Sequence, residues 1–337
     1  MRIVKANAVL LDNAKLSPYQ CIERAGRTCY KSEDKITDDS AVKFVKGMFK
    51  SGHTAMCEHG TIYLKISDMM SHLLKEWLDK IKNDKKINDV ITPYIHITNN
   101  YVSASFRVFA NMMDIYFKSN YANVALEALY MALSKTYPDV FSSDRAVNAN
   151  DKYTAEITVF PNKTAFADDV KNTFGSDSNY VLKKHLVISI IFTTDRGVSH
   201  EIVRHRPCGF AQESTRYCNY SKDKFGNEIT VIEPCFWPDH DSVQYRLWKN
   251  SCEQSEKNYF ELTAAGATPQ EARSVLPNSL KTEIVVTATE AEWQHMINLR
   301  WLGTTGAPHP QAKECFGLAV PSLVKESEGR IVTGIQK

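Results

Sequence analysis

The fold of this chain is indicated most clearly by the segment KTEIVVTATEAEWQHMINLRWLG, residues 281–303. Its first part is rich in β-branched side chains and predicts a strand over Lys281–Thr289. The second part predicts a helix over Glu290–Leu302 that ends at Gly303, since glycine commonly follows the last turn of a helix. A strand that leads directly into a helix is typical of folds that pack helices against a sheet.

The chain on either side of this segment alternates predicted strands and helices, with no internal repeat and no low-complexity tract. A second buried strand is predicted over Leu186–Phe192. The helix that follows it is expected to carry Glu201, Arg204 and His205 on one face. Further strands are predicted over 61–66, 94–98, 153–160 and 229–236, and further helices over 18–30, 40–51, 70–81, 121–136, 241–265 and 269–276. This order indicates the α/β (α+β) class.

The composition is that of a soluble enzyme. Lys plus Arg number 41 and Asp plus Glu number 39, so the net charge of +2 provides no broad positive field for nucleic acid. The longest apolar run, Leu186–Phe192, is far shorter than the roughly 20 residues that cross a bilayer. The first residues show no signal-peptide pattern, so we expect a cytoplasmic protein without a membrane partner. The 8 cysteines form no Cys-x-x-Cys pair, which indicates free thiols and no metal site.

A cationic stretch, RHRPCGFAQESTRY, occupies residues 204–217. Arginine forks bind phosphate or carboxylate through paired hydrogen bonds, so this stretch is suited to anions. Simpler interpretations remain open from the residues alone. The Arg-His-Arg triplet could be a solvated helix face, Ser214 could be a helix N-cap, and Arg273 and Arg300 could form ordinary surface ion pairs.

Four other blocks occur in a defined order around this stretch. They are GRTCYKS (26–32), GHTAMCEHG (52–60), EARSVLPNSLKTEIVVTATEAEWQHMINLR (271–300) and HPQAKE (309–314). With the Arg-His-Arg stretch, they resemble the sequence pattern of the flavin-dependent thymidylate synthases. The resemblance implies a single catalytic domain over 1–337 with a mixed, largely antiparallel sheet flanked by helices. It also implies an α-rich insert at about 67–184 that compact family members lack.

The resemblance implies a reaction as well. Family members methylate dUMP to dTMP with a one-carbon unit from 5,10-methylenetetrahydrofolate and with FAD that NADPH reduces. It further implies a homotetramer. The positions that match the family's flavin contacts are His53, Glu58, Arg204, His205, Arg206, Gln212, Thr289 and His295. Cys29 and Ala55 stand where relatives often have hydroxyl residues.

The positions that match the family's dUMP contacts are Glu201, Arg204, Gln212, Glu213, Ser214, Thr215, Arg216, Arg273 and Arg300. Arg300 is expected to be catalytic, because a permanent cation beside the pyrimidine stabilises the ring as an anion. Glu201 replaces a glutamine that is common in compact relatives. A carboxylate beside the uracil would have to be protonated or paired with a cation.

Two other functional classes stay open from the residues alone. A nucleic-acid-binding protein could use the arginine-rich loop with Phe210 and Tyr217 as stacking faces, but the balanced charge does not favour it. A hydrolase could use Ser214 or Cys208 as its nucleophile, but no His-plus-acid relay is evident in the sequence. We therefore expect an enzyme without a nucleic-acid partner.

Overall fold

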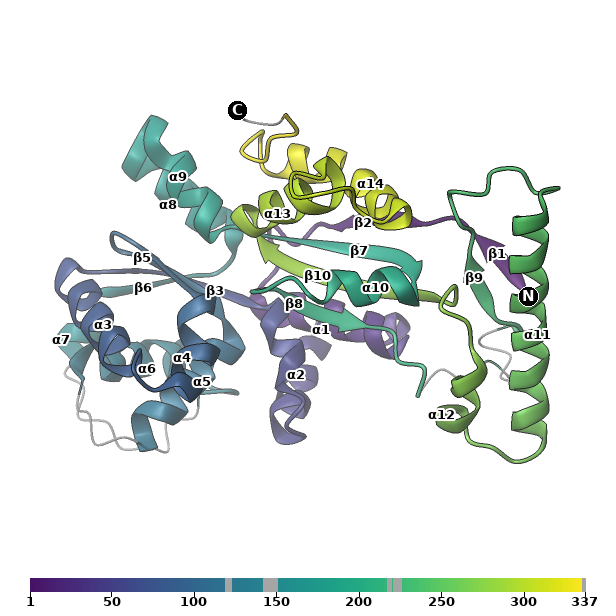
Figure 1. Ribbon diagram of the computed structural model, residues 1–337. Coiled ribbons are helices and arrows are strands. Elements are labelled where there is room, and N and C mark those ends of the chain that lie inside the picture. The colour runs from purple at the N-terminus through teal and green to yellow at the C-terminus, as the bar shows by residue number, and fades with distance from the viewer. Residues whose placement is uncertain (119–122, 142–150, 217–219, 221–225, 335–337) are drawn as a thin grey trace.

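The computed structural model describes residues 1–118, 123–141, 151–216, 220 and 226–334. Three sheets follow one another across the molecule, each with its own helices (Figure 1). We name the central one the core sheet and the one built largely from the predicted insert the insert sheet. The third is a two-stranded sheet at the opposite side of the molecule from the insert sheet.

The core sheet has four antiparallel strands in the order β2-β7-β10-β8. They are β2 (Asn7–Leu11), β7 (Val187–Asp195), β10 (Lys281–Thr289) and β8 (Gly209–Gln212). Val285 in the middle of β10 lies opposite Ile191 of β7 on one side and Ala211 of β8 on the other. The predicted strands at 186–192 and 281–289 and the largely antiparallel sheet are therefore confirmed.

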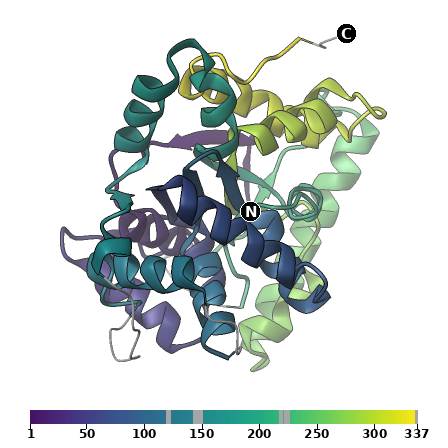
Figure 2. The ribbon, with the colours of Figure 1, turned by 90° about the vertical axis from the view of Figure 1, so that its left-hand side faces the viewer.

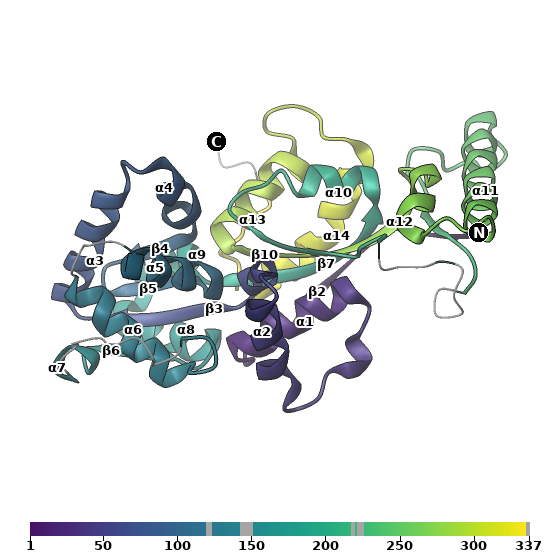
Figure 3. The ribbon, with the colours of Figure 1, turned by 90° about the horizontal axis from the view of Figure 1, so that it is seen from below.

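Both faces of the core sheet are covered by helices, as Figure 3 shows. Ile284 and Val286 point to one face and pack with Trp293 and Phe316, whereas Val285 packs on the other face with Ala25. This alternation follows from the two-residue period of a strand. The first face carries α10 (Arg196–Ile202), α13 (Glu290–Ile297) and α14 (Pro310–Glu326), and the second carries α1 (Pro18–Tyr30) and α2 (Ser40–Lys50).

The insert sheet has the order β4-β5-β3-β6, again antiparallel. Its strands are β3 (Thr61–Ile66), β4 (Ile95–Thr98), β5 (Tyr101–Ser105) and β6 (Ile157–Phe160). Its helices are α3 (Asp68–Ile81), α4 (Lys85–Ile91), α5 (Phe106–Lys118), α6 (Val124–Thr136), α7 (Asp151–Thr154), α8 (Lys163–Phe174) and α9 (Ser178–His185). The α-rich character is confirmed, but the helices surround a sheet that includes β3, which precedes residue 67. Of the two strands that flank the insert, β7 is the one that lies in the core sheet.

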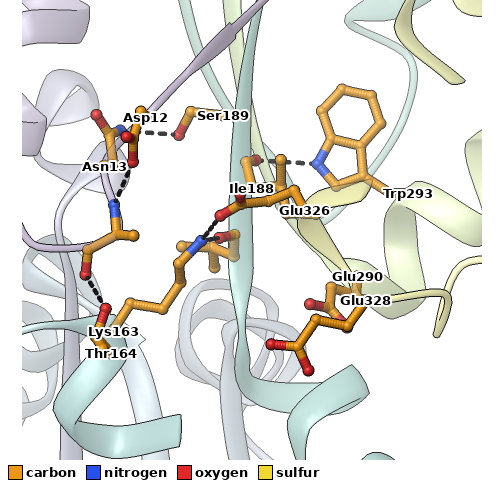
Figure 4. Close-up of polar contacts among 12 residues, drawn as sticks. Asp12, Asn13, Lys163, Thr164, Ile188, Ser189, Glu290, Trp293, Glu326 and Glu328 are labelled. Atoms are coloured by element: carbon orange, nitrogen blue, oxygen red, sulfur yellow. Dashed lines mark hydrogen bonds and ion pairs between the residues drawn. The ribbon is translucent and has the colours of Figure 1, made fainter. Parts of the chain in front are cut away.

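Helix α8 fastens the insert to the core. Figure 2 shows α8 and α9 beside the C-terminal segment, and Figure 4 shows the polar contacts of α8. Lys163 pairs with Glu326 of α14 and donates to the Val187 carbonyl oxygen at 3.3 Å. The Thr164 hydroxyl donates to the Ala14 carbonyl oxygen at 2.9 Å. The insert therefore contacts both ends of the core sequence.

The third sheet pairs β1 (Arg2–Val4) with β9 (Thr230–Ile232) in parallel. It packs with the long helix α11 (Val243–Ala264) and the short helix α12 (Pro269–Ala272), around a small core that includes Val231 and Tyr259. Both helices were predicted from the sequence. Among the described residues, no helix combines the length and the apolar character that a membrane crossing requires.

The predicted helix through Arg204 and His205 is wrong. Helix α10 ends at Ile202, and the chain then makes a tight turn in which the His205 amide donates to the Ile202 carbonyl oxygen at 3.2 Å. Pro207 explains the early end, because proline has no N–H to donate and biases the preceding residue away from helical geometry. Arg204 is exposed and His205 is buried, so the three residues do not form the single helix face that was predicted.

Candidate active site

Arg300 is at the centre of one group of predicted site residues. It lies in the π-helical turn Asn298–Leu302 that continues α13. Its Nε donates to His205 Nε2 at 3.0 Å, and its Nη1 donates to the Glu201 carboxylate at 2.7 Å. Its Nη2 also reaches the Glu201 carbonyl oxygen at 3.4 Å. A guanidinium has five N–H groups, so these three contacts leave two for a ligand.

Glu201 is paired with a cation, which is one of the two states expected from the sequence for a carboxylate at this position. The side chains of Arg300 and Glu201 are 21% and 28% exposed, so the pair lies at the surface of the core layer rather than inside it. A partly exposed pair of this kind can exchange partners at modest cost in free energy. Arg300 can therefore turn toward a bound anion without leaving a buried charge behind.

His205 is neutral in this arrangement. Burial, the Arg300 cation and His295 together lower the pKa of His205 to about 4. Because Arg300 can only donate, His205 Nε2 must be the acceptor, which places the proton on Nδ1. The imidazole is thus held in one tautomer between the Arg-His-Arg turn and α13.

Glu292 joins this group and was missed by the sequence analysis. One ligand atom from each of His205, Glu292 and His295 lies within 4.8 Å of the others. Burial raises the pKa of Glu292 to about 7, and its Oε1 is buried with no hydrogen-bond partner among the described residues. The three-residue spacing of Glu292 and His295 on a predicted helix was the available signal. The adjacent Arg300 cation opposes binding of a metal ion here.

Arg204 and Arg206 flank the buried His205 and are both exposed. Within the described parts of the chain, neither side chain has a hydrogen bond or an ion pair. Two uncommitted guanidinium groups on one short turn are suited to an anion with several oxygens, such as a diphosphate.

A second group of predicted residues lies around the turn after β8. Arg273, in the 3₁₀ turn Arg273–Val275, donates to the Thr215 hydroxyl at 3.3 Å. The Ser214 hydroxyl accepts from the Arg216 amide at 3.3 Å, so Ser214 supports a turn rather than capping a helix. Arg216 and Arg273 are exposed. Tyr217, considered as a stacking face, is outside the described residues.

Two predicted dUMP residues, Gln212 and Glu213, use their side chains within the protein. The Gln212 amide donates to Ser199 at 2.9 Å and to Thr282 at 3.3 Å. Glu213 is only 4% exposed, and its carboxylate accepts from Lys281 Nζ at 3.3 Å. These contacts hold both side chains in place where β8 pairs with β10, and their roles as ligand contacts stay predictions. Sequence patterns alone did not reveal that short strand.

The remaining predicted flavin residues are His53, Glu58 and Thr289. Glu58 pairs with Arg107 of α5, an insert residue that the sequence analysis missed. Burial raises the pKa of Glu58 although Arg107 opposes the shift. The Thr289 hydroxyl caps α13 by accepting from the Glu292 amide at 3.2 Å. Glu58 and Thr289 line one cavity of about 50 Å³, whereas His53 is exposed at the start of the 3₁₀ helix Thr54–His59.

The cysteines in this region have structural surroundings. The Cys29 thiol donates to the Gln212 carbonyl oxygen at 2.8 Å, so it takes over a hydrogen bond that a hydroxyl could make. Cys208 is 9% exposed, and burial raises the pKa of its thiol well above the usual value. A thiol that stays protonated is a poor nucleophile, which argues against a cysteine hydrolase.

The segments that form this group match a known protein family. A family model described as "Thymidylate synthase complementing protein" matches residues 142–315, which are 174 of the 337 residues. The chain belongs to this family. The match contains the Arg-His-Arg turn, β8, β10 and the turn with Arg300, so the group around Arg300 is built from family segments.

Individual relatives agree with the family match. Flavin-dependent thymidylate synthase of Pyrococcus abyssi is 25% identical over 185 residues, covering 54% of this chain and 68% of the relative. The enzymes of Thermococcus onnurineus and Geobacter sulfurreducens are 28% and 31% identical, covering 38% and 31% of this chain. The aligned parts span 50% and 43% of those two relatives.

A solved structure also matches part of the chain. The crystal structure of the UMP/dUMP methylase PolB from Streptomyces cacaoi, bound with 5-Br UMP, gives a TM-score of 0.37 at 17% identity. The match covers 50% of this chain and 86% of that chain. Similarity at this level carries no argument about the site.

Proposed function

We propose that the protein is a flavin-dependent thymidylate synthase that methylates dUMP to dTMP with 5,10-methylenetetrahydrofolate, FAD and NADPH. The observation that carries this proposal is the contact of Arg300 with Glu201 and His205. Arg300 follows Glu201 by 99 residues and His205 by 95 residues, so the contact joins two separate family motifs. Two N–H groups of the Arg300 guanidinium remain available at the surface.

The residues around the Arg-His-Arg turn fit a flavin dinucleotide. Arg204 and Arg206 offer exposed cations for the diphosphate, while the neutral His205 offers an uncharged surface for a ring and a cavity lies nearby. When bound, the flavin supplies the hydride transfer that no side chain can perform. Glu58 and Thr289 line that cavity, and His53 precedes the 3₁₀ helix that carries Glu58.

Arg300 is the residue we assign to the pyrimidine. In the free protein its charge is balanced by Glu201. A uracil ring that develops negative charge would compete with Glu201 for the guanidinium, and the two unused N–H groups could serve it directly. The closer the ring comes to an anion, the more strongly Arg300 would hold it, which is the differential binding that lowers a reaction barrier.

The phosphate of dUMP is assigned to the turn Ser214–Arg216 with Arg273. These residues contact one another, whereas Arg300 contacts the Arg-His-Arg turn. Arg273 precedes β10 and Arg300 follows it. This division supports a homotetramer in which Arg300 of one subunit and the phosphate turn of another complete each site.

Binding of FAD tests the proposal first. The purified protein should carry FAD or take it up saturably, which quenches flavin fluorescence, and should form dTMP when dUMP, methylenetetrahydrofolate and NADPH are added. A folded sample that binds no flavin would refute the assignment.

Mixed oligomers test the shared site. Arg300→Ala and Arg216→Ala chains should each be inactive, and co-refolding should restore activity because some sites then contain both arginines intact. Mixed oligomers that form but remain as inactive as the parents would contradict the shared site and leave the proposed reaction standing.

A further inference from the structure

The cavity beside Glu58 and Thr289 lies on the seam between the core sheet and the insert sheet. Its core side is formed by Thr289 and the stretch Pro207–Gly209, directly after the Arg-His-Arg turn. Its insert side includes His96 of β4, Ser103 of β5 and His185 at the end of α9. The insert therefore contributes walls to a cavity that two predicted flavin residues share.

His185 is an unusual component of this wall. It is 0% exposed, and its Nδ1 is 2.9 Å from the Ser103 hydroxyl. Its Nε2 is buried and has no hydrogen-bond partner among the described residues. An unmade hydrogen bond at a buried nitrogen costs free energy, so a residue in this state indicates a missing partner. The His96 ring stands edge-on to it, with the ring centroids 6.3 Å apart.

The charge states of the histidines that line the cavity restrict which kind of ligand group can bond to His185. Burial lowers the pKa of His96 to about 4 and that of His185 to about 3, so both rings are neutral at physiological pH. With Glu58 on the same cavity, these walls do not favour a phosphate, which calls for charged donors. A neutral imidazole suits one donor or acceptor on the edge of a neutral heteroaromatic ring.

The size of the cavity and the residues that line it indicate which ligand has the ring that bonds to His185. At about 50 Å³ it is smaller than the roughly 150 Å³ of a cavity that holds benzene, so only the edge of a ring can enter. Two of the predicted flavin residues line it and none of the predicted dUMP residues does. We propose that His185, supported by His96, gives the insert a direct role in cofactor binding by making a hydrogen bond to a ring edge of the flavin dinucleotide. This inference rests on the proposed function.

The test uses the full chain freed of flavin, with FAD, FMN and ADP as probes. His185→Asn keeps an amide near the position of Nδ1 for Ser103 and removes the group at Nε2. The Kd for FAD should rise about five- to tenfold, as expected for one lost hydrogen bond. The control is His72→Asn, in the same insert, where the side chain is 74% exposed, and it should leave the Kd unchanged. Far-UV circular dichroism and Tm establish that each variant is folded.

The probes separate the two rings of the cofactor. If the isoalloxazine contacts His185, FAD and FMN should both bind more weakly to the variant, whereas an adenine contact should weaken FAD and ADP. Unchanged affinity for all three would overturn the inference while wild-type flavin binding preserved the proposed function. If wild type itself bound no flavin, both would fail. Should His185→Asn not fold, His96→Asn decides, with a smaller rise in Kd expected and an unchanged Kd counting against the inference.

Discussion

The core layer is the core sheet with its helices, and the insert layer is the insert sheet with its helices. Both are built on a four-stranded antiparallel sheet, yet they place their polar residues differently. At the core layer the cations Arg204 and Arg206 are exposed, and the Arg300 side chain is 21% exposed. In the insert layer the imidazole of His185 is buried and neutral. The difference indicates that the core presents charge to ligands, whereas the insert contributes packing and, at the seam, uncharged walls.

The largest stability effect should come from opening the insert core. Phe166 is 0% exposed and its ring contacts those of Tyr63, Tyr101 and Phe160. Phe166→Ala should lower the free energy of unfolding by about 3–5 kcal/mol, because it removes a buried ring and leaves a cavity. Urea unfolding followed by circular dichroism measures this. Tyr180→Ala, which removes a ring that is 63% exposed, is the control and should cost less than about 0.5 kcal/mol.

The number of unfolding transitions tests whether the core layer and the insert layer form one domain. If the insert is integral to one domain, fluorescence and circular dichroism should follow the same transition in wild type. Separate transitions, with Phe166→Ala moving only one of them, would show instead that the two layers fold independently.

The largest activity effect should come from the core layer. Arg300→Ala should lower the rate of dTMP formation about 10²–10³-fold, the usual loss when a preorganised electrostatic contact is removed. Reduction of bound flavin by NADPH should be largely spared, and single-turnover assays separate the two steps. Arg246→Ala, which removes an exposed arginine on α11, should change neither rate. Equal loss of both steps in Arg300→Ala would mean that Arg300 acts on the flavin or on the fold.

The sequence predicted local structure well and long-range structure less well. Strand β10 has the predicted bounds, and the predicted start of α13 is correct, because β-branched runs and helix boundaries are local signals. The four residues of β8 carry no such signal and form a strand only because β10 lies beside them. The predicted helix through His205 was wrong because its apolar and polar periodicity was given more weight than Pro207, which limits how far a helix can continue.

The candidate site shows the same division. The motifs predicted Glu201, His205 and Arg300 as site residues, and the structure brings these three into contact. Arg107 and His185 were missed because their partners, Glu58 and Ser103, are 49 and 82 residues away in the sequence. Contacts between such distant segments depend on tertiary packing, which no local pattern encodes.

The carboxyl group of Glu292 should make stability depend on pH. Its pKa is about 7 in the folded protein, above the ordinary value of 4.5, so the folded state holds its proton more tightly than the unfolded state. Stability is therefore lost as the pH rises from about 4.5 to about 7. Glu292→Gln removes this loss and should be roughly 1–2 kcal/mol more stable than wild type at pH 8, after allowance for solvent screening, with no gain at pH 4.

Chemical denaturation at the two pH values measures the difference. Glu261→Gln on α11, where the side chain is 65% exposed, is the matched control and should show no pH-dependent gain. A Glu292→Gln variant whose stability gain is the same at both pH values would place the effect in packing instead of ionisation.

The smallest effects should come from the ion pairs that join the two layers, and they distinguish buried from exposed contacts. Lys163 is 13% exposed and bonds both Glu326 and the Val187 carbonyl oxygen, whereas Lys171 is 41% exposed and, within the described ranges, pairs with Glu328 alone. Lys163→Met keeps the apolar stem but leaves a half-buried carboxylate and a carbonyl without their donor, so it should cost about 1–2 kcal/mol. Lys171→Met should cost less than about 0.5 kcal/mol, because solvent replaces the lost partner.

Urea unfolding of both variants at low and high salt checks this: salt should diminish the Lys171 effect and largely spare that of Lys163. Equal costs for the two would mean that the seam is held by apolar packing alone, and the polar contacts of α8 would then have no special part in joining the insert to the core.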